Sequence, residues 1–384
     1  MVKPIISRAL ISRALISRAL IPRALIPRAL IPRALIPRAL IPRALIPRAF
    51  IPVVGALVVS ALGACGSFQD PNVVVDLRVL GISSDPADQV VDVDLTNPDP
   101  QAVVAQLVPF QVCALIADPG ASRALIWSAS ACERGDSASG ERCATANTSD
   151  TTIQLGSGTI PDPDTSVPEP SLCFTVEPNA AFLNLLFTIA QDDDLRGVGG
   201  IDANLVLQIG GADTTDRSND IFATKILRVS PRIPAALTAN HNPSIDRIDT
   251  RPTATATAPE TPLPLLRCAE NPSPPTLAAG QKLRLTPVEP DGVRETYATP
   301  TLDGSSQTFT ETLTYQWTVS AGKLSRGKSG GPHDLAGNPA PLFTDFTAPS
   351  AKDLDLPANI SLWVVQRDER LGVHWYESCI RVTP

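Results

Sequence analysis

A five-residue repeat occupies the start of the chain and prevents this part from forming a packed domain. Between Ile6 and Phe50 nine five-residue units, ISRAL and later IPRAL with the last ending in Phe50, place an arginine at every fifth position. On a helix each repeat steps about 140° around the axis, and on a strand an odd period puts successive arginines on opposite faces. Prolines in the later units remove helix hydrogen bonds. We therefore expect residues 6–50 to build no core.

An uncharged apolar run follows the repeat. Residues 50–63, FIPVVGALVVSALG, are too few to cross a bilayer comfortably and have the length of a signal-peptide core. The run ends in LGACGS, where Leu62, Gly63 and Ala64 precede Cys65. This pattern resembles the lipobox of bacterial lipoproteins. The resemblance implies that Cys65 is diacylated at sulfur, that the peptide is cut before it, and that the new N-terminus is acylated.

The lipobox resemblance divides the N-terminal part of the chain. Residues 1–64 become a basic leader that is removed, and residues 65–73 become a lipidated tether. Acyl chains then attach the protein to the membrane, and no other cofactor is expected. Gly66 follows the cysteine in place of the aspartate that signals inner-membrane retention, which favours the outer membrane. The alternative is a free cysteine beside a membrane helix.

Removing the leader makes the remaining chain strongly acidic. The leader holds ten of the 32 Lys and Arg residues and none of the 39 acidic residues, so the mature net charge is 22 minus 39, or −17. Such a charge disfavours nucleic acid and anionic lipid head groups as partners.

Six cysteines follow Cys65, and in an exported chain they indicate three disulfides with 15 arithmetically allowed pairings. The first predicted pair joins the two cysteines that lie closest in sequence, and the second joins the only two cysteines of the C-terminal half. The third joins the two cysteines that remain. In that order, the predicted pairs are Cys132–Cys143, Cys268–Cys379 and Cys113–Cys173. The absence of a C-x-x-C motif and of a cysteine–histidine cluster argues against a metal site.

Residues 74–234 are predicted to form a β-rich module, because short apolar runs alternate with turn residues. The expected strands are VVVDLRVLGIS, LVPFQVCALIA, TTIQLGSGTI, LCFTV, NLVLQI and FATKILRV. Residues 180–190, AAFLNLLFTIA, contain few β-branched residues and predict a short helix.

Residues 235–384 are predicted to form a second β-rich module. The Thr-, Ala- and Pro-rich residues 250–264 are expected to be an exposed loop. In LTYQWTVS, at 313–320, apolar and polar residues alternate as in a half-buried strand. Residues 360–368 and 373–382 should form a closing hairpin across the turn ERLG.

Three segments of the second module resemble immunoglobulin-like or PKD-like β-sandwich modules, namely YQWTVSAG, FTAPS and LWVVQRDERLGVHW. Together with the lipobox, the chain resembles uncharacterised bacterial envelope lipoproteins built from such modules. The implied fold is mainly β, with two immunoglobulin-like sandwiches and a short helix in the first. PKD modules proper carry an acidic, glycine-rich turn where this chain has SAGKLSRG.

GKLSRGKS, at 322–329, fits the P-loop pattern, and GKSGG around Ser329 fits a nucleophile elbow. Both motifs require a helix directly afterwards, and the glycines and prolines of GGPHDLAGNPAP do not allow one. We therefore expect a basic hairpin loop that binds no ATP. A serine hydrolase using Ser329 and a distant histidine stays open as a second alternative function.

Two further polar segments contain motifs that could indicate a binding site. ERGDS, at 133–137, lies between two cysteines as adhesion ligands do, but Gly-Asp also forms ordinary turns. Asp192–Asp194 suggest calcium, yet an EF-hand register from Asp192 puts Arg196 and Ala203 at ligand positions. No metal site is predicted.

The functional prediction is a non-enzymatic, membrane-anchored envelope lipoprotein that binds another envelope component or acts as a spacer. The first alternative is a surface protein that binds polysaccharide by stacking sugar rings on Trp363 or Trp375. Trp363 projects to the face opposite Leu362 and Val364. That face is either open to a ligand or covered by the other module.

Overall fold

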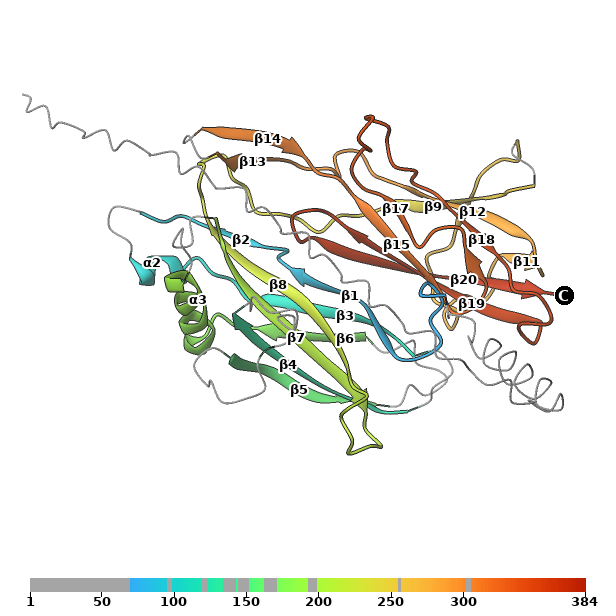
Figure 1. Cartoon of the computed structure of the whole chain (residues 1–384), viewed down its shortest axis with the longest axis horizontal. Coiled ribbons are helices and arrows are strands. Elements are labelled where there is room, and N and C mark those ends of the chain that lie inside the picture. Colours follow the sequence, from blue (N-terminus) through green and yellow to red (C-terminus); the bar gives the residue numbers. More distant parts are fainter. Residues whose placement is uncertain are drawn as a thin grey trace, which may run out of the picture. The chain divides into compact units, whose positions relative to one another are not determined.

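The computed structural model describes residues 70–94, 99–118, 123–133, 143, 152–161, 171–192, 199–254, 257–301 and 305–384. Phe68–Pro384 form one compact unit. The described residues are mainly β, as the sequence predicts, and their strands pair into sandwiches (Figure 1).

The first module contains two sheets. Its strands are β1 Arg78–Asp85, β2 Gln89–Val91, β3 Phe110–Ala117, β4 Leu125–Glu133, β5 Thr152–Ile160, β6 Ser171–Val176, β7 Ile201–Gly211 and β8 Ile221–Pro231. One sheet has the order β1-β3-β6, and the other has the order β2-β8-β7-β4-β5. The helices of this module are α2 Pro100–Val104 and α3 Ala180–Asp192.

The second module repeats this arrangement with more strands. They are β9 Arg247–Pro252, β10 Thr261–Leu263, β11 Thr276–Ala278, β12 Lys282–Val288, β13 Thr296–Pro300, β14 Ser306–Thr310, β15 Thr314–Val319, β16 Lys323–Leu324, β17 Lys328–Gly330, β18 Thr344–Thr347, β19 Ala358–Arg367 and β20 Val373–Thr383. The sheets run β10-β9-β12-β18-β16 and β11-β20-β19-β15-β17, and β13 and β14 form a separate hairpin.

The two modules share one strand order. In the first, β1, β3 and β6 take the places of immunoglobulin strands A, B and E, while β4, β7 and β8 take those of C, F and G. In the second, β9, β12 and β18 correspond to A, B and E, and β15, β19 and β20 to C, F and G. Each module also pairs a short strand in parallel with its last strand, β2 with β8 and β11 with β20.

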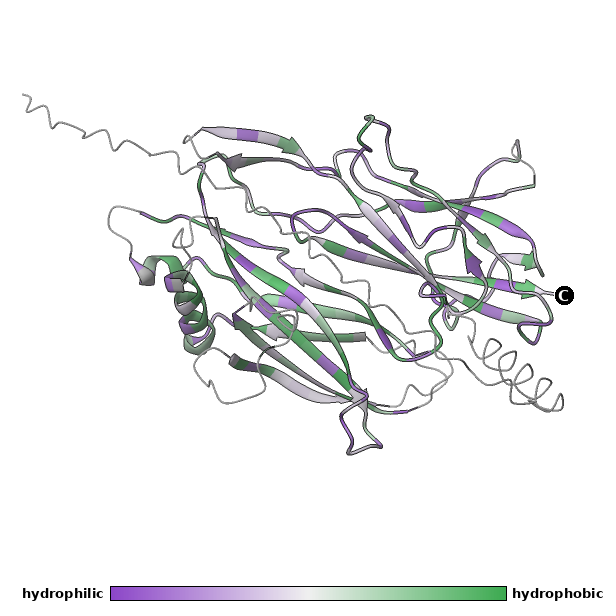
Figure 2. Ribbon diagram, viewed as in Figure 1, coloured by the Kyte–Doolittle hydropathy of each residue, from purple (hydrophilic) through white to green (hydrophobic). Residues whose placement is uncertain are grey.

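Each sandwich encloses its own hydrophobic core. The first core joins the facing sheets through residues such as Val112, Ile116 and Leu207, all fully buried. The second contains Trp317 and Phe346 from opposite sheets. Figure 2 shows hydrophobic residues concentrated in the strands of both modules, alternating with hydrophilic ones along several of them. Burial of this apolar surface is the main stabilising contribution to each sandwich.

Helix α3 confirms the helix expected at 180–190. The side chain of Asn179 accepts a hydrogen bond from the backbone N–H of Phe182 (3.1 Å) and thereby satisfies one free donor at the helix start. Phe182, Leu185 and Leu186 are buried on one face at helical spacing. The ring of Phe182 meets Phe110 of β3 edge-on at 6.4 Å, which fixes the helix against the first core.

The strand expected from LTYQWTVS is confirmed as β15. Tyr315, Trp317 and Val319 are completely buried, whereas Gln316 on the opposite face is exposed. The closing hairpin is also confirmed, with β19 and β20 paired in antiparallel register across the turn at 368–372. Residues 330–384 contain no helix, so GKLSRGKS is followed by strands.

Residues 250–264 correct one expectation, because this stretch is not wholly a loop. β9 extends into it to Pro252, and β10 occupies Thr261–Leu263. The Thr250 hydroxyl donates to the backbone oxygen of Thr261 (2.9 Å). Threonine favours strands, and β10 lies at the sheet edge, where its proline interrupts no ladder on the far side.

Strand β4 was not predicted, although it lies between β7 and β5 in its sheet. Its inward positions include Ala129 and Ala131, both fully buried but small. Alanine and serine give little hydrophobic alternation, which is why the sequence pattern misses this strand.

Candidate functional site

The predicted lipidation site lies outside the described residues. Cys65 and the lipobox residues Leu62, Gly63 and Ala64 all precede Asp70, where the described chain begins. The Arg-Gly-Asp segment and the second and third aspartates of the acidic run are likewise outside. No described helix is long and apolar enough to cross a bilayer. The described residues also contain no group of three or more His, Cys, Asp or Glu placed to hold a metal ion.

The structure contains three disulfides with the same pairings that the sequence predicts. They are Cys113–Cys173, Cys132–Cys143 and Cys268–Cys379. The first joins β3 to β6 at directly paired positions. The third closes a separation of 111 residues, for which loop-closure entropy predicts a stabilisation of about 4 to 5 kcal/mol.

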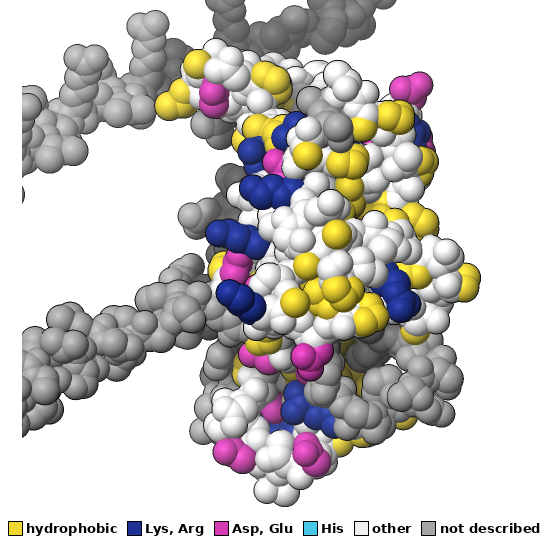
Figure 3. Space-filling view, turned by 90° about the vertical axis from the view of Figure 1, so that its right-hand side faces the viewer, with side chains coloured by type: hydrophobic (Ala, Val, Ile, Leu, Met, Phe, Trp, Pro, Cys, Tyr) yellow, Lys and Arg dark blue, Asp and Glu magenta, His cyan; other side chains and the backbone are white. Residues whose placement is uncertain are grey.

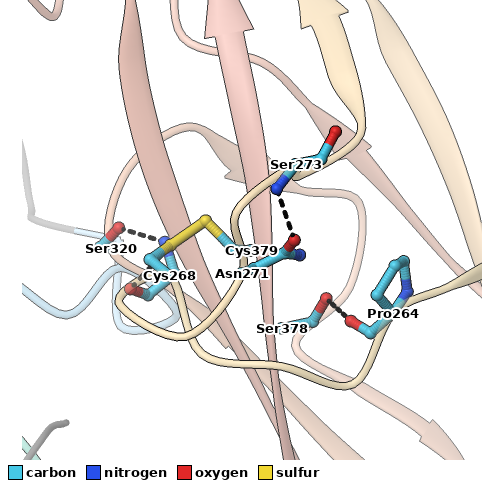
Figure 4. The surroundings of a disulfide bond; sticks show 8 residues. Pro264, Cys268, Asn271, Ser273, Ser320, Ser378 and Cys379 are labelled. Atoms are coloured by element: carbon cyan, nitrogen blue, oxygen red, sulfur yellow. Dashed lines mark hydrogen bonds between the residues drawn. A yellow bond between two sulfur atoms is a disulfide. The ribbon is translucent and has the colours of Figure 1, made fainter.

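The surroundings of Cys268–Cys379 attach an irregular segment to the last strand (Figure 4). Beside the disulfide, the Ser378 hydroxyl donates to the backbone oxygen of Pro264 (2.6 Å), and Asn271 accepts from the backbone N–H of Ser273 (3.1 Å). The disulfide and the Ser378–Pro264 hydrogen bond hold the segment that enters β11 against β20, and the Asn271–Ser273 bond orders that segment internally. The cysteines are therefore structural and do not form an exposed reactive site.

The ligand-contact role considered for Trp363 is wrong, because this ring is completely buried. Trp363 belongs to a third hydrophobic cluster, which we call the seam. The seam consists of Val74, Leu80, Leu115, Ala117, Trp363, Val365 and Val373. Its members come from the first module and from β19 and β20 of the second. The outer face of the second module's sheet is therefore covered at this point by the first module.

Trp375 does not replace Trp363 as a free aromatic platform. It is half-buried, packs against the seam and stacks beside His374, with ring centres 6.4 Å apart. Its cross-strand partner is Val365, itself a member of the seam. These two tryptophans therefore do not form the exposed row of rings that a polysaccharide-binding face requires.

Ser329 holds a structural position and has no histidine partner. It is 3% exposed on the edge strand β17. Its Oγ accepts a hydrogen bond from the indole N–H of Trp317 (2.8 Å) and donates one to the backbone oxygen of Leu342 (2.8 Å). A hydroxyl engaged in this way lacks the adjacent general base that activates a nucleophile.

Charged residues surround the seam at the turn between β19 and β20. Asp368 accepts hydrogen bonds from the backbone N–H groups of Arg370 (2.8 Å) and Gly372 (2.7 Å), and from the side chain of Asn240 (3.0 Å). The backbone N–H of Asn240 donates in turn to Asp88 of the first module (2.6 Å). A Cβ on Gly372 would collide with the Asp368 carboxylate, so a larger residue there would have to displace this carboxylate.

Arg370 is the centre of this polar joint. Its guanidinium lies 3.4 Å from carboxylate oxygens of both Glu295 and Glu311 and donates to the backbone oxygen of Thr238 (2.6 Å). It also stacks over the ring of Tyr297 on the β13–β14 hairpin, 4.8 Å from the ring centre. One cation thus connects the linker between the modules, the inserted hairpin and the β19–β20 turn.

Burial alters the proton affinities of the joint. Desolvation, with a smaller contribution from the charge of Asp368, raises the pKa of Glu311 to about 7. Desolvation also raises the pKa values of Asp88 and Asp368. It lowers the pKa of Lys225 to about 8, because the β8 ammonium is buried beside the joint.

Lys225 also supports an unusual backbone conformation. Leu371 has a φ of 83°, which side-chain-bearing residues rarely adopt. The Lys225 ammonium donates to the backbone oxygen of this residue. A contact from the first module therefore stabilises a strained turn of the second, a strain of roughly 1 to 3 kcal/mol.

A small, partly open cavity lies against the polar joint. Its volume is about 140 Å³, and its lining includes Asp88, Arg228, Tyr297 and Arg370. Arg228 forms two hydrogen bonds to Asp202 (2.6 and 2.7 Å), so its charge is already neutralised. The arrangement is that of a joint between modules, with its charges satisfied by one another.

The sequence gives little warning of this joint. QRDERLG, at 366–372, reads as an ordinary charged hairpin turn, and such turns are normally solvated. The acidic and basic partners lie far away in sequence. On the face drawn in Figure 3, Lys and Arg side chains gather mainly along one margin, with acidic side chains between them.

No family model matches the chain, and no curated protein matches it. Among solved structures, a variant of Salmonella alpha-2-macroglobulin is 9% identical with a TM-score of 0.20; the match covers 82% of this chain and 17% of that one. The two tandem V-type regions of the chitin-binding protein VCBP3 are 7% identical with a TM-score of 0.19, covering 80% and 100%. Dimeric latent PorU from Porphyromonas gingivalis is 9% identical with a TM-score of 0.18, covering 80% and 24%. The strand order, and not these weak likenesses, defines the architecture.

Proposed function

We propose that this protein is a lipid-anchored envelope protein, not an enzyme, in which two β-sandwich modules act as one stiff spacer or binding element. The observation that carries the stiffness is the seam. Trp363 is fully buried among residues of both modules, and the Arg370 joint surrounds it with ion pairs. Interfaces that bury an aromatic anchor and satisfy their charges resist relative motion.

The lipid anchor is supported by independent features of the chain. Three disulfides are typical of proteins that fold in an oxidising, exported compartment. The first described residues are attached to the second module, since the Val74 N–H donates to Val319 (2.8 Å) and the Val319 N–H donates to Asn72 (2.9 Å). A chain anchored at Cys65 would therefore be held close to the membrane, with the outer membrane the favoured one.

In the described part of the chain, two kinds of group that could serve in catalysis have structural partners. Ser329 is occupied by Trp317 and Leu342, and the buried acids of the joint surround Arg370. The hypothesis of polysaccharide binding depended mainly on an exposed Trp363, and this ring is buried. We therefore favour an envelope protein as the partner.

The decisive experiment is the intact mass and membrane partitioning of the protein purified from its own envelope, compared with Cys65→Ser. We expect the parent to begin at Cys65 and to carry diacylglycerol and an acyl group, and the variant to retain its leader without lipid. Ser67→Ala is the matched control and should mature like the parent. A Cys65→Ser protein found in membranes at the mature size would overturn the proposal.

A further inference from the structure

Arg367, at the end of β19, is the one half-buried arginine of the described chain that has neither a carboxylate nor an aromatic ring as a partner. Most described arginines form ion pairs. Arg326 lies over the ring of Phe343, 4.7 Å from its centre, and Arg381 is exposed. The Arg367 guanidinium donates to neutral oxygens, namely Gln316 Oε1 (2.8 Å) and the backbone oxygen of Leu80 (3.1 Å).

The charge of Arg367 is not compensated by a nearby carboxylate. Burial lowers the pKa of Arg367, and no nearby carboxylate raises it again. The neighbouring Asp368 directs its oxygens away, toward Asn240 and the backbone of the turn. A half-buried guanidinium with unused donors is a favourable position for an anionic ligand.

Arg367 lies in a groove of about 590 Å³ on the outer face of the second module. The groove is lined by Asn72, Thr314, Gln316, Gly327, Lys328 and Arg367. Strand register brings its polar members together, because Thr314 pairs with Arg367 and Gln316 pairs with Lys328. Directly paired residues project to the same face of a sheet. The groove therefore carries two cations, and no carboxylate is among its lining residues.

We propose that this groove binds a phosphate-type oxyanion. Arginine can bind two phosphate oxygens in parallel, and Lys328 adds an exposed point charge. Because the Gln316 carboxamide oxygen accepts from Arg367, its NH₂ group can serve as a further donor to the ligand. The net acidity of the mature chain disfavours general binding to anionic surfaces, so the selectivity comes from this local pair of cations.

The phosphate has two chemically equivalent sources, a lipid head group or a free phosphate compound. Asn72 lies on the rim of the groove, seven residues after Cys65. Seven extended residues reach at most ~25 Å. If the proposed anchor at Cys65 is correct, the groove lies within reach of lipid head groups. The oxyanion proposal itself does not depend on that anchor.

The test uses the protein purified in neutral detergent, titrated by calorimetry with inorganic phosphate and, separately, with short-chain phosphatidylglycerol. The variants are Arg367→Gln and Lys328→Gln, with exposed Lys352→Gln as the matched control. We expect at least one probe to bind the parent and the control equally. Arg367→Gln should weaken binding tenfold or more and Lys328→Gln several-fold, with Lys328→Arg restoring it.

Each outcome has a defined meaning. Binding of phosphatidylglycerol in preference to inorganic phosphate identifies the head group as the source, and the reverse identifies a free phosphate. If neither probe binds, or if both groove variants bind like Lys352→Gln, the proposal is overturned. Lys328 is exposed, so its variant stays informative even if Arg367→Gln unfolds. The intact mass of the same sample reports the lipid anchor separately, so either proposal can fail alone.

Discussion

Replacing Glu311 by glutamine should change how the stability of the protein depends on pH. Glu311 is 2% exposed, and burial raises its pKa from 4.5 to about 7. The folded protein therefore binds more protons than the unfolded chain between these values. Its contribution to stability is fully present below pH 4.5 and is lost as the pH rises through 7. The difference between the two pKa values corresponds to about 3 kcal/mol.

The assay is urea unfolding of the parent and Glu311→Gln, with disulfides intact, between about pH 4.5 and about pH 8. Glutamine keeps the shape but cannot ionise, so subtracting its unfolding free energy from that of the parent isolates Glu311. We expect this difference to fall by about 3 kcal/mol as the pH rises. Glu270→Gln, at an exposed glutamate, is the matched control. A difference that is flat, or that rises with pH, would refute the reasoning.

Two further substitutions test the structural assignments by urea unfolding at fixed pH. Trp363→Ala removes the completely buried ring of the seam and should lower the unfolding free energy by about 3 to 5 kcal/mol; a loss under about 1 kcal/mol would mean that the ring is not buried between the modules. Ser329→Ala leaves the indole N–H of Trp317 without its acceptor and should cost about 1 to 3 kcal/mol. An unchanged stability would contradict the structural role of this hydroxyl.

Much of the fold could be predicted from local sequence patterns. The alternation in LTYQWTVS, the closing hairpin and the helix at 180–190 each depend on the period with which apolar residues recur, and all three were confirmed. Strand β4 escaped because its buried positions include the small residues Ala129 and Ala131, and β9 and β10 escaped because threonine and proline resemble a linker.

The candidate sites were less predictable, because their character depends on contacts between distant residues. The sequence does not show whether the strand face that carries Trp363 is exposed or covered. In the structure Leu80 and Leu115 of the first module cover it. The sequence likewise shows an arginine at 367 but not that its partners are neutral oxygens.

By itself, the sequence determined the mainly β fold class and the helix, because these follow from periodicity and composition. It also predicted the three disulfide pairs from the positions of the cysteines, and the structure confirmed them. The tertiary structure alone decided that the two modules share one strand order, that a tryptophan closes the seam between them, and that Arg370 gathers acids from separate segments. These features arise where the surfaces of distant segments meet. Burial sets both the hydrophobic stabilisation and the proton affinity of a side chain, and burial is a property of the folded chain.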